Sequence, residues 1–154
     1  MRQPLRAYQV GPARAIVQAA LSGRGGVFAV MMARQAGKNQ TSAHIEALLL
    51  NAYRRRGGQI VKAAPTFRPQ ALTSLLRLQG ALEGAVLPLR PIRERGYMLR
   101  LDRARALFLS AAPGANVVGA TANLLLEADE AQDVDEVKWS KDFRPMAAST
   151  NAVS

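Results

Sequence analysis

The chain has 154 residues, contains no cysteine and carries a formal net charge of +10 at pH 7. This length suits one domain, and the lack of cysteine excludes both a disulfide framework and a cysteine-ligated metal site. No apolar run approaches the ~18 residues of a membrane span, so the sequence predicts no membrane partner. His44 is the only histidine, which argues against metal chemistry that needs several histidines.

Helical and strand patterns alternate along the chain, which predicts an α/β fold with a mostly parallel sheet flanked by helices. Apolar spacing and stop signals predict helices at 12–21, 39–53, 70–83 and 137–143. Strands are expected at 27–32, 59–64 and 124–128, paired short strands at 98–101 and 106–109, and a further strand beginning at Ala147.

A Gly-Lys pair, Gly37-Lys38, stands between a predicted strand and a predicted helix. This order is the layout of a P-loop, in which backbone N–H groups and the helix N-terminus cradle phosphates that a lysine neutralises. The generic pattern has glycine where Met32 stands and Ser or Thr where Asn39 stands. In isolation, the segment fits an ordinary strand-to-helix turn equally well.

Arginines concentrate at 54–56 and between positions 90 and 105. The first cluster ends a predicted helix, where the helix dipole favours cations whatever the function. The second cluster lies in a loop and hairpin, and Arg93, Arg95 and Arg103 are predicted to contact the DNA backbone. Residues 1–122 have a net charge of +14 and residues 123–154 a net charge of −4, so the basic body suits a nucleic-acid partner.

Two adjacent carboxylates, Asp129 and Glu130, follow the apolar run 124–126. A buried parallel strand would deliver both to the C-terminal rim of the sheet, although an acidic turn after a strand is the alternative. At that rim Asp129 would hold magnesium through its water shell, and Glu130 would orient or deprotonate the attacking water. Glu127 falls on the same side of the strand as Asp129, either at the rim or as a supporting group.

Together the two motifs resemble the ATPase half of the large terminase subunit of tailed bacteriophages, the motor that packages DNA into capsids. The segment Ala33-Arg34-Gln35-Ala36-Gly37-Lys38 fits the family's phosphate loop, which has an arginine near its start and no leading glycine. Residues 5–9 are similar to its adenine-recognition segment, and residues 63–71 to the stretch after its second core strand. Ser149 and Thr150 lie where the family places its coupling motif. The resemblance covers nearly the whole chain.

The resemblance implies a P-loop NTPase that couples ATP hydrolysis with magnesium to translocation of double-stranded DNA. Arg34 would stabilise charge on the transferred phosphoryl group, and Glu130 would orient or deprotonate the attacking water. Asp129 and Asn39 would hold the magnesium. The implied nucleotide contacts are Tyr8, Gln9, Arg34, Gln35, Ala36, Gly37, Lys38, Asn39 and Gln40. The implied partners are duplex DNA, the small terminase subunit, the capsid portal and further copies in a homo-oligomeric ring, in the cytoplasm of an infected or lysogenic bacterial host.

Two other functions fit the same residues. A helicase-like, nucleic-acid-dependent ATPase would carry a second RecA-like domain and a late arginine motif, for which 154 residues leave no room. A non-catalytic basic DNA-binding fragment would differ by lacking ATP turnover. Terminases continue past the coupling motif with further strands and a nuclease domain, so the resemblance implies one ATPase domain over 1–154 that is incomplete at its C-terminus.

Overall fold

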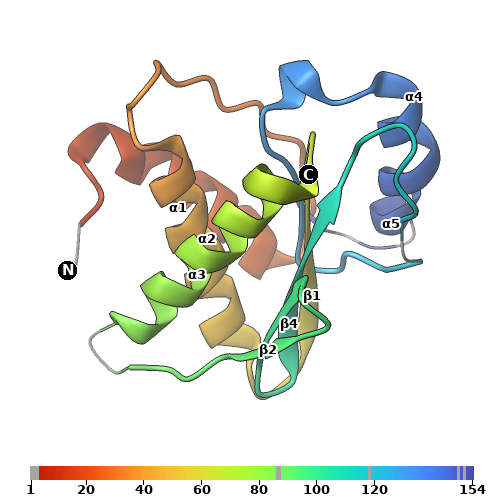
Figure 1. Cartoon of the computed structure of the whole chain (residues 1–154). Helices are drawn as coiled ribbons and strands as arrows, with labels where there is room; N and C mark the ends of the chain where they lie inside the picture. The colour runs from red at the N-terminus through yellow and green to blue at the C-terminus, as the bar shows by residue number, and fades with distance from the viewer. Residues whose placement is uncertain (1–3, 86–87, 118, 149, 151) are drawn as a thin grey trace.

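The computed structural model describes residues 4–85, 88–117, 119–148, 150 and 152–154, and it shows an α/β fold with a sheet between two layers of helices (Figure 1). The strands are β1 (Gly58–Ala64), β2 (Ile92–Glu94), β3 (Met98–Leu101), β4 (Ala104–Ser110) and β5 (Leu125–Ala128). The helices are α1 (Ala7–Ser22), α2 (Lys38–Tyr53), α3 (Leu72–Glu83), α4 (Glu136–Lys138) and α5 (Pro145–Ala148). Single turns of π-helix occur at Phe67–Ala71 and Trp139–Phe143, and a 3-10 turn at Ala131–Asp133.

The five strands form a mixed sheet in the order β2-β3-β4-β1-β5. Strand β1 pairs in parallel with β4 and β5, whereas β2, β3 and β4 pair in antiparallel fashion. The prediction of an α/β fold is confirmed, but the sheet is mixed rather than mostly parallel, because two of its four strand pairings are antiparallel. The links at 95–97 and 102–103 are hairpin turns, and turns this short cannot carry the crossover that a parallel pair needs.

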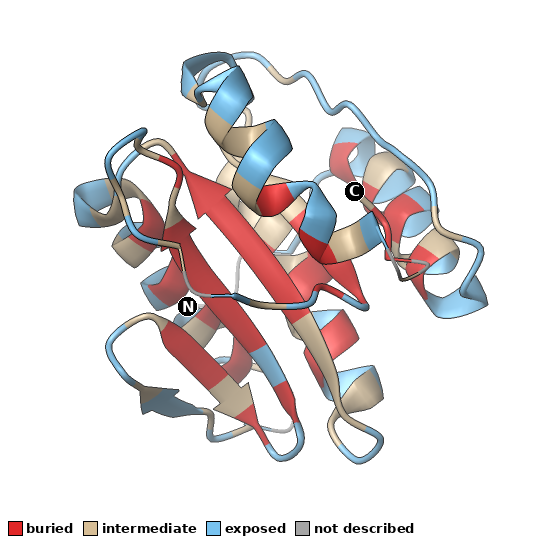
Figure 2. Ribbon diagram, turned by 90° about the vertical axis from the view of Figure 1, so that its right-hand side faces the viewer, coloured by how far each residue is buried: buried red, intermediate tan, exposed pale blue. Residues whose placement is uncertain are grey.

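Strand β1 lies inside the sheet between β4 and β5, and helices cover both faces of the sheet. Ile60 and Phe108 of β4 belong to the core formed with α1, α2 and α3, whereas Val61 belongs to a second core with Phe143 and Met146. Ile60, Val61 and Phe108 are all fully buried. Figure 2 shows the central strands buried along much of their length, as expected for strands with helices on both faces.

Helix α1 begins at Ala7, five residues before the predicted start at Pro12. The Gln9 side chain accepts a hydrogen bond from the Arg6 backbone N–H at 2.7 Å, which caps the first turn. Helix α2 and strands β1, β3, β4 and β5 form close to their predicted positions. Within the described residues, no helix is both long and apolar enough to cross a membrane.

Two predicted strands are absent from the described part of the chain. Residues 27–32 are mostly exposed and form no strand. Residues 152–154 lie between this segment and β5, and they pair only with Gly26 and Phe28 on this side. Ala147 lies in α5, which Pro145 begins; the predicted helix at 137–143 is instead split into α4 and a π-helical turn. Proline is favoured in the first turn of a helix because its missing N–H is not needed there.

We expect Phe108→Ala to lower the free energy of unfolding by about 3–5 kcal/mol, because it removes a fully buried ring from the core. Urea denaturation followed by circular dichroism would measure the change. Leu48→Ala is the control, since Leu48 is 54% exposed on α2, and a loss within about 0.5 kcal/mol is expected there. Equal losses for the two variants would contradict the assignment of Phe108 to the core.

Candidate functional site

The loop that enters α2 is shaped by Gly37. Its φ of 81° is in the left-handed region, and a Cβ atom at this position would lie 2.4 Å from Nε2 of Gln9. Glycine is therefore required on both conformational and steric grounds. Helix α2 begins at Lys38, and no side chain caps its N-terminus. Its first N–H groups point into the loop, as in an anion-binding helix terminus.

The side chains of Gln9 and Tyr8 hold this loop from α1. Gln9 is 2% exposed and donates hydrogen bonds to the carbonyls of Ala36 at 3.0 Å and Gly37 at 3.2 Å. The Tyr8 hydroxyl donates to the Ala36 carbonyl at 2.9 Å. Both residues thus lie beside the predicted phosphate loop, where they contact its backbone. Adenine binding by Gln9 and Tyr8 stays a prediction.

Lys38 brings the two sequence motifs together. Its Nζ lies 2.6 Å from Oε1 of Glu130 and 3.3 Å from Oδ1 of Asp129, although 91 residues separate it from Asp129 in the chain. The Asp129 N–H extends the ladder of β5 by donating to Ala63 of β1 at 2.8 Å. Glu130 then adopts a left-handed conformation with φ 49°, which turns the chain sharply at the carboxyl end of the strand.

Charge pairing shifts the pKa values of the facing groups in opposite directions. Burial disfavours charged Lys38, but the hydrogen bond to Glu130 and the charge of Asp129 outweigh it and raise the Lys38 pKa. The hydrogen bond from Lys38, assisted by one from Gln132, lowers the Glu130 pKa, and the charge of Arg34 lowers it further. Both members of the pair are therefore ionised near neutral pH.

A hollow of about 830 Å³ opens above Lys38 and Glu130, within the size range of small-molecule sites. Most of the predicted nucleotide contacts lie on its wall. These are Gln9, Arg34, Gln35, Ala36, Gly37, Lys38, Asn39 and Gln40. Arg6, Arg77, Gln132 and Asp133 also line the hollow but were not among the residues predicted from the sequence. Arg34 is exposed at its edge.

Asn39 has a feature that suits the metal role predicted for it. Its side-chain oxygen Oδ1 is buried and has no hydrogen-bond partner among the described residues. Buried polar atoms are rarely left without a partner, and an amide oxygen can ligate a hard cation. The described residues contain no cluster of three or more His, Asp or Glu side chains, but nucleotide-bound magnesium needs only one or two protein carboxylates.

A buried polar network joins α2, β1 and β5, and of its members only Glu127 was predicted from the sequence. Lys62 of β1 is 4% exposed and bonds Oε1 of Glu46 on α2 at 2.8 Å and the Ser42 hydroxyl at 2.7 Å. The same hydroxyl lies 2.7 Å from Oε1 of Glu127 on β5. Glu127 is thus a supporting group behind the rim. The available sequence signal was Lys62, the one charged residue in an apolar strand.

The two glutamates of this network share a single cation. Burial raises the pKa of Glu127 well above its ordinary value, and the charge of Glu46 raises it further, against the attraction of Lys62. Burial opposes the charge of Lys62, but Glu46 and Glu127 together raise the Lys62 pKa. Oε2 of each glutamate is buried and accepts no hydrogen bond from a donor group of the described residues, and a hydrogen bond between the two glutamates also raises the Glu127 pKa. A neutral Glu127 beside the ion pair best satisfies these constraints.

Other predicted residues lie away from the hollow. The Thr150 hydroxyl donates to the Ala122 carbonyl at 2.7 Å, just before β5, while Ser149 lies outside the described residues. Arg93, Arg95 and Arg103 belong to the hairpins of β2, β3 and β4, and none of them lines this hollow. The structure therefore separates the predicted nucleotide contacts from the predicted DNA contacts. The sequence matches no model of a known protein family and no curated protein.

Lys62→Met should lower the free energy of unfolding by about 3–5 kcal/mol, because it leaves the fully buried Glu46 carboxylate without its cation. Urea denaturation at pH 7 measures the loss. Lys141→Met removes the same charge from an exposed position and should change stability by no more than about 0.5 kcal/mol. If both variants lost the same amount, the buried pair would not stabilise the fold.

The stability of the Glu127→Gln variant should rise relative to that of the wild type as pH rises. The folded-state pKa of Glu127 is raised, so the wild type takes up a proton on folding and loses stability as pH rises from ~4.3 through that pKa. The amide has no such dependence. Urea denaturation at pH 5 and pH 8, with the exposed Glu136→Gln as control, tests this. A stability difference that stays constant between the two pH values would disprove it.

Proposed function

We propose that this chain is an ATPase of a viral DNA-packaging motor, which couples hydrolysis of magnesium-bound ATP to movement of double-stranded DNA. One observation carries the proposal: Lys38, at the start of α2, lies within 3.3 Å of carboxylates at the end of β5. A phosphate loop, a lysine and two carboxylates at the edge of parallel strands form the machinery of phosphoryl transfer in P-loop enzymes.

Phosphate binding falls to Lys38 and the N–H groups of the α2 N-terminus. Lys38 is paired with Glu130 here, so it exchanges this carboxylate for the β- and γ-phosphates when the nucleotide enters. Its raised pKa keeps the amine charged for both partners. Gln9 holds the carbonyls of Ala36 and Gly37 by hydrogen bonds, which fixes the loop before the ligand arrives.

The metal position suits Asp129 and Asn39. Asp129 has a side chain that is 10% exposed at the rim, and the buried Asn39 Oδ1 has a free acceptor position. When bound with ATP, magnesium neutralises charge that develops between the β- and γ-phosphates. Asn39 is a neutral ligand where a hydroxyl is usual in P-loops, so Asp129 supplies the charge of the site.

Water activation falls to Glu130. Once Lys38 moves to the phosphates, the Glu130 carboxylate is free to orient a water in line with the γ-phosphate and to accept its proton. The left-handed turn at Glu130 and the hydrogen bond from Gln132 hold the carboxylate at the hollow. Arg34, which is exposed at the edge of the hollow, would stabilise negative charge on the transferred phosphoryl group.

DNA is the partner that the charge favours. The net charge of +14 on residues 1–122 attracts the phosphate backbone of a nucleic acid, whatever its base sequence. The small terminase subunit, the capsid portal and further copies in a ring are the partners that the resemblance adds to this proposal. ATP turnover with and without linear duplex DNA tests the function, and a nucleic-acid-binding chain without turnover would refute it.

Lys38→Ala and Glu130→Gln should separate nucleotide binding from hydrolysis. Loss of the lysine should weaken ATP binding by about 10–100-fold, since a hydrogen bond to a charged group contributes about 1.5–3 kcal/mol. Glu130→Gln should lower kcat by at least about 100-fold, with ATP affinity unchanged or higher because Lys38 is released. Equilibrium binding of a fluorescent ATP analogue and phosphate release would measure the two effects.

The matched controls are Lys141→Ala and Glu136→Gln, which make the same chemical changes at exposed positions. Both should retain wild-type binding and turnover. If Glu130→Gln hydrolysed ATP at the wild-type rate, the assignment of Glu130 to the water would be wrong.

A further inference from the structure

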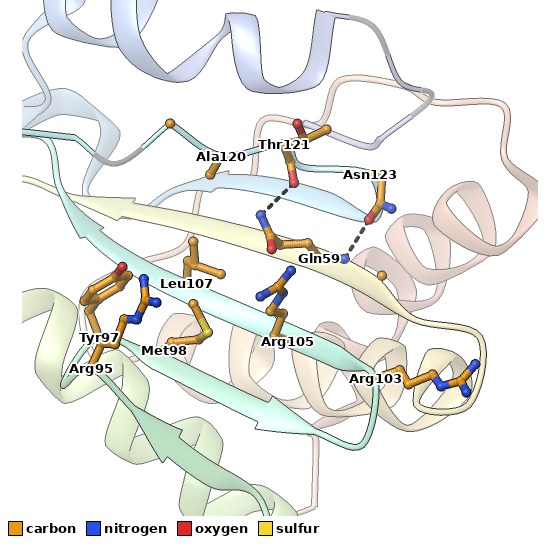
Figure 3. A pocket seen from close by; sticks show the side chains of 12 residues that line it. Gln59, Arg95, Tyr97, Met98, Arg103, Arg105, Leu107, Ala120, Thr121 and Asn123 are labelled. Carbon is orange, nitrogen blue, oxygen red and sulfur yellow. Dashed lines mark hydrogen bonds between the residues drawn. The ribbon is translucent and has the colours of Figure 1, made fainter.

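A second hollow, of about 740 Å³, lies on the opposite face of the sheet from α1, α2 and α3 (Figure 3). Its floor includes Met98 of β3 and Leu107 of β4, and the segment 119–123 forms a wall. Gln59 of β1 ties this wall to the sheet, because its Nε2 donates to the Thr121 carbonyl at 2.9 Å. No residue lines both this hollow and the one beside Lys38.

Three arginines follow the length of this hollow. Figure 3 shows Arg95 at one end, Arg105 in the middle and Arg103 at the other end. No acidic residue lines the hollow, and within the described part of the chain none of these three guanidinium groups has an ion pair or side-chain hydrogen bond. Neighbouring Arg93 and Arg100 differ, because they bond Gly96 and Glu94 within the hairpin.

The spacing of the arginines suits a chain of phosphates better than a single anion. Arg95 lies in the turn before β3, and Arg103 lies in the turn after it. The four residues of β3 rise ~3.4 Å each, which separates the two turns by roughly 15 Å. One phosphate cannot reach both ends, whereas an extended phosphodiester chain can.

The floor of the hollow suits an unpaired base. Tyr97 is half-buried beside Arg95, and the buried side chains of Met98 and Leu107 lie in the floor next to it. Aromatic rings in basic grooves stack bases in single-stranded nucleic acids. A duplex keeps its bases stacked inside and is read by elements that protrude into its grooves, so a concave surface with one aromatic ring offers it little.

We propose that this hollow binds single-stranded nucleic acid, with Arg95, Arg105 and Arg103 on successive phosphates and an unpaired base stacked on Tyr97. This site goes beyond the proposed ATP hydrolysis and does not depend on it. The hollow lies on the other face of the sheet and runs from the start of β1 and β4 to the turn before β3, and none of its described lining residues lines the hollow at Lys38. The two ligands can therefore bind at the same time.

The test is fluorescence anisotropy of a labelled 12-nucleotide oligothymidylate, measured without ATP over a series of salt concentrations. The double variant Arg95→Ala/Arg105→Ala should bind at least about tenfold more weakly than the wild type. It should also flatten the slope of log affinity against log salt by about 1.4, because each phosphate contact on a single strand contributes about 0.7. The control, Arg14→Ala/Arg24→Ala, removes the same charge from exposed positions and should change the slope by less than half as much.

Tyr97→Ala should reduce affinity at least about fivefold without changing the salt slope, and Tyr97→Phe should restore binding, because only the ring is needed to stack a base. Urea denaturation of each variant checks that the fold is intact. The same two arginines should matter less for a 12-base-pair duplex than for the single strand.

Three results would overturn the proposal. Equal losses in the hollow and control variants would place the contact elsewhere. A duplex that bound as tightly as the single strand, and lost as much in the double variant, would show that unpaired bases are not recognised. Polyglutamate that displaced the oligonucleotide at an equal concentration of charges would identify an acidic polypeptide as the occupant. Because ATP is absent, failure here is distinct from failure of the ATPase assay.

Discussion

The buried contact between Lys62 and Glu46 fixes α2 over the sheet, and the geometry of the candidate site depends on it. Lys62 lies at the middle of β1, so its bond of 2.8 Å to Glu46 sets the position of the helix that carries Lys38. Ser42 links the same helix to Glu127 of β5. Lys62 thus joins three elements: strand β1, helix α2, which begins with Lys38, and strand β5, which the two carboxylates follow. Any movement of α2 away from β1 would leave the buried Glu46 carboxylate without its cation, Lys62. This cost holds the three elements in one arrangement.

The sheet separates two regions with different chemistry. At the carboxyl ends of β1 and β5, Lys38 and Glu130 line a hollow of about 830 Å³, and Asp129 lies 3.3 Å from the Lys38 amine. On the other face, from the start of β1 and β4 to the turn before β3, three arginines border a hollow of about 740 Å³, and among the described residues they form no ion pair and no acidic residue lines the hollow. Parallel pairing of β1 with β5 gathers the carboxylates at one edge. The two antiparallel hairpins bring arginines to the second hollow, because the turn between β2 and β3 carries Arg95 and the turn between β3 and β4 carries Arg103.

Long periodic segments were predictable from the sequence, whereas segments that depend on a partner strand were not. Helix α2 and strand β1 follow from local apolar patterns, and the structure confirms them within one residue at each end. Residues 27–32 have strand-forming side chains but pair only from Gly26 to Phe28, because the residues beside them are 152–154. Ala147 fits a strand by composition, yet Pro145 begins a helix there. Strand pairing depends on contacts between residues far apart in the chain, and the β-propensity of a segment does not describe these contacts.

The sequence by itself determined which chemical groups the candidate site contains: the Gly-Lys loop, the Asp-Glu pair and an excess of arginine in the first 122 residues. These are local patterns, because a Gly-Lys pair between a strand and a helix and carboxylates that end a strand are visible without any partner. Only the tertiary structure decided that Lys38 meets Glu130 at 2.6 Å, that Gln9 holds the loop, and that Lys62 lies under Glu127. It also decided that Arg95 and Arg105 share a hollow while Arg93 bonds within its hairpin. Such contacts join residues far apart in the chain, and the packing of the sheet against its helices alone sets their distances.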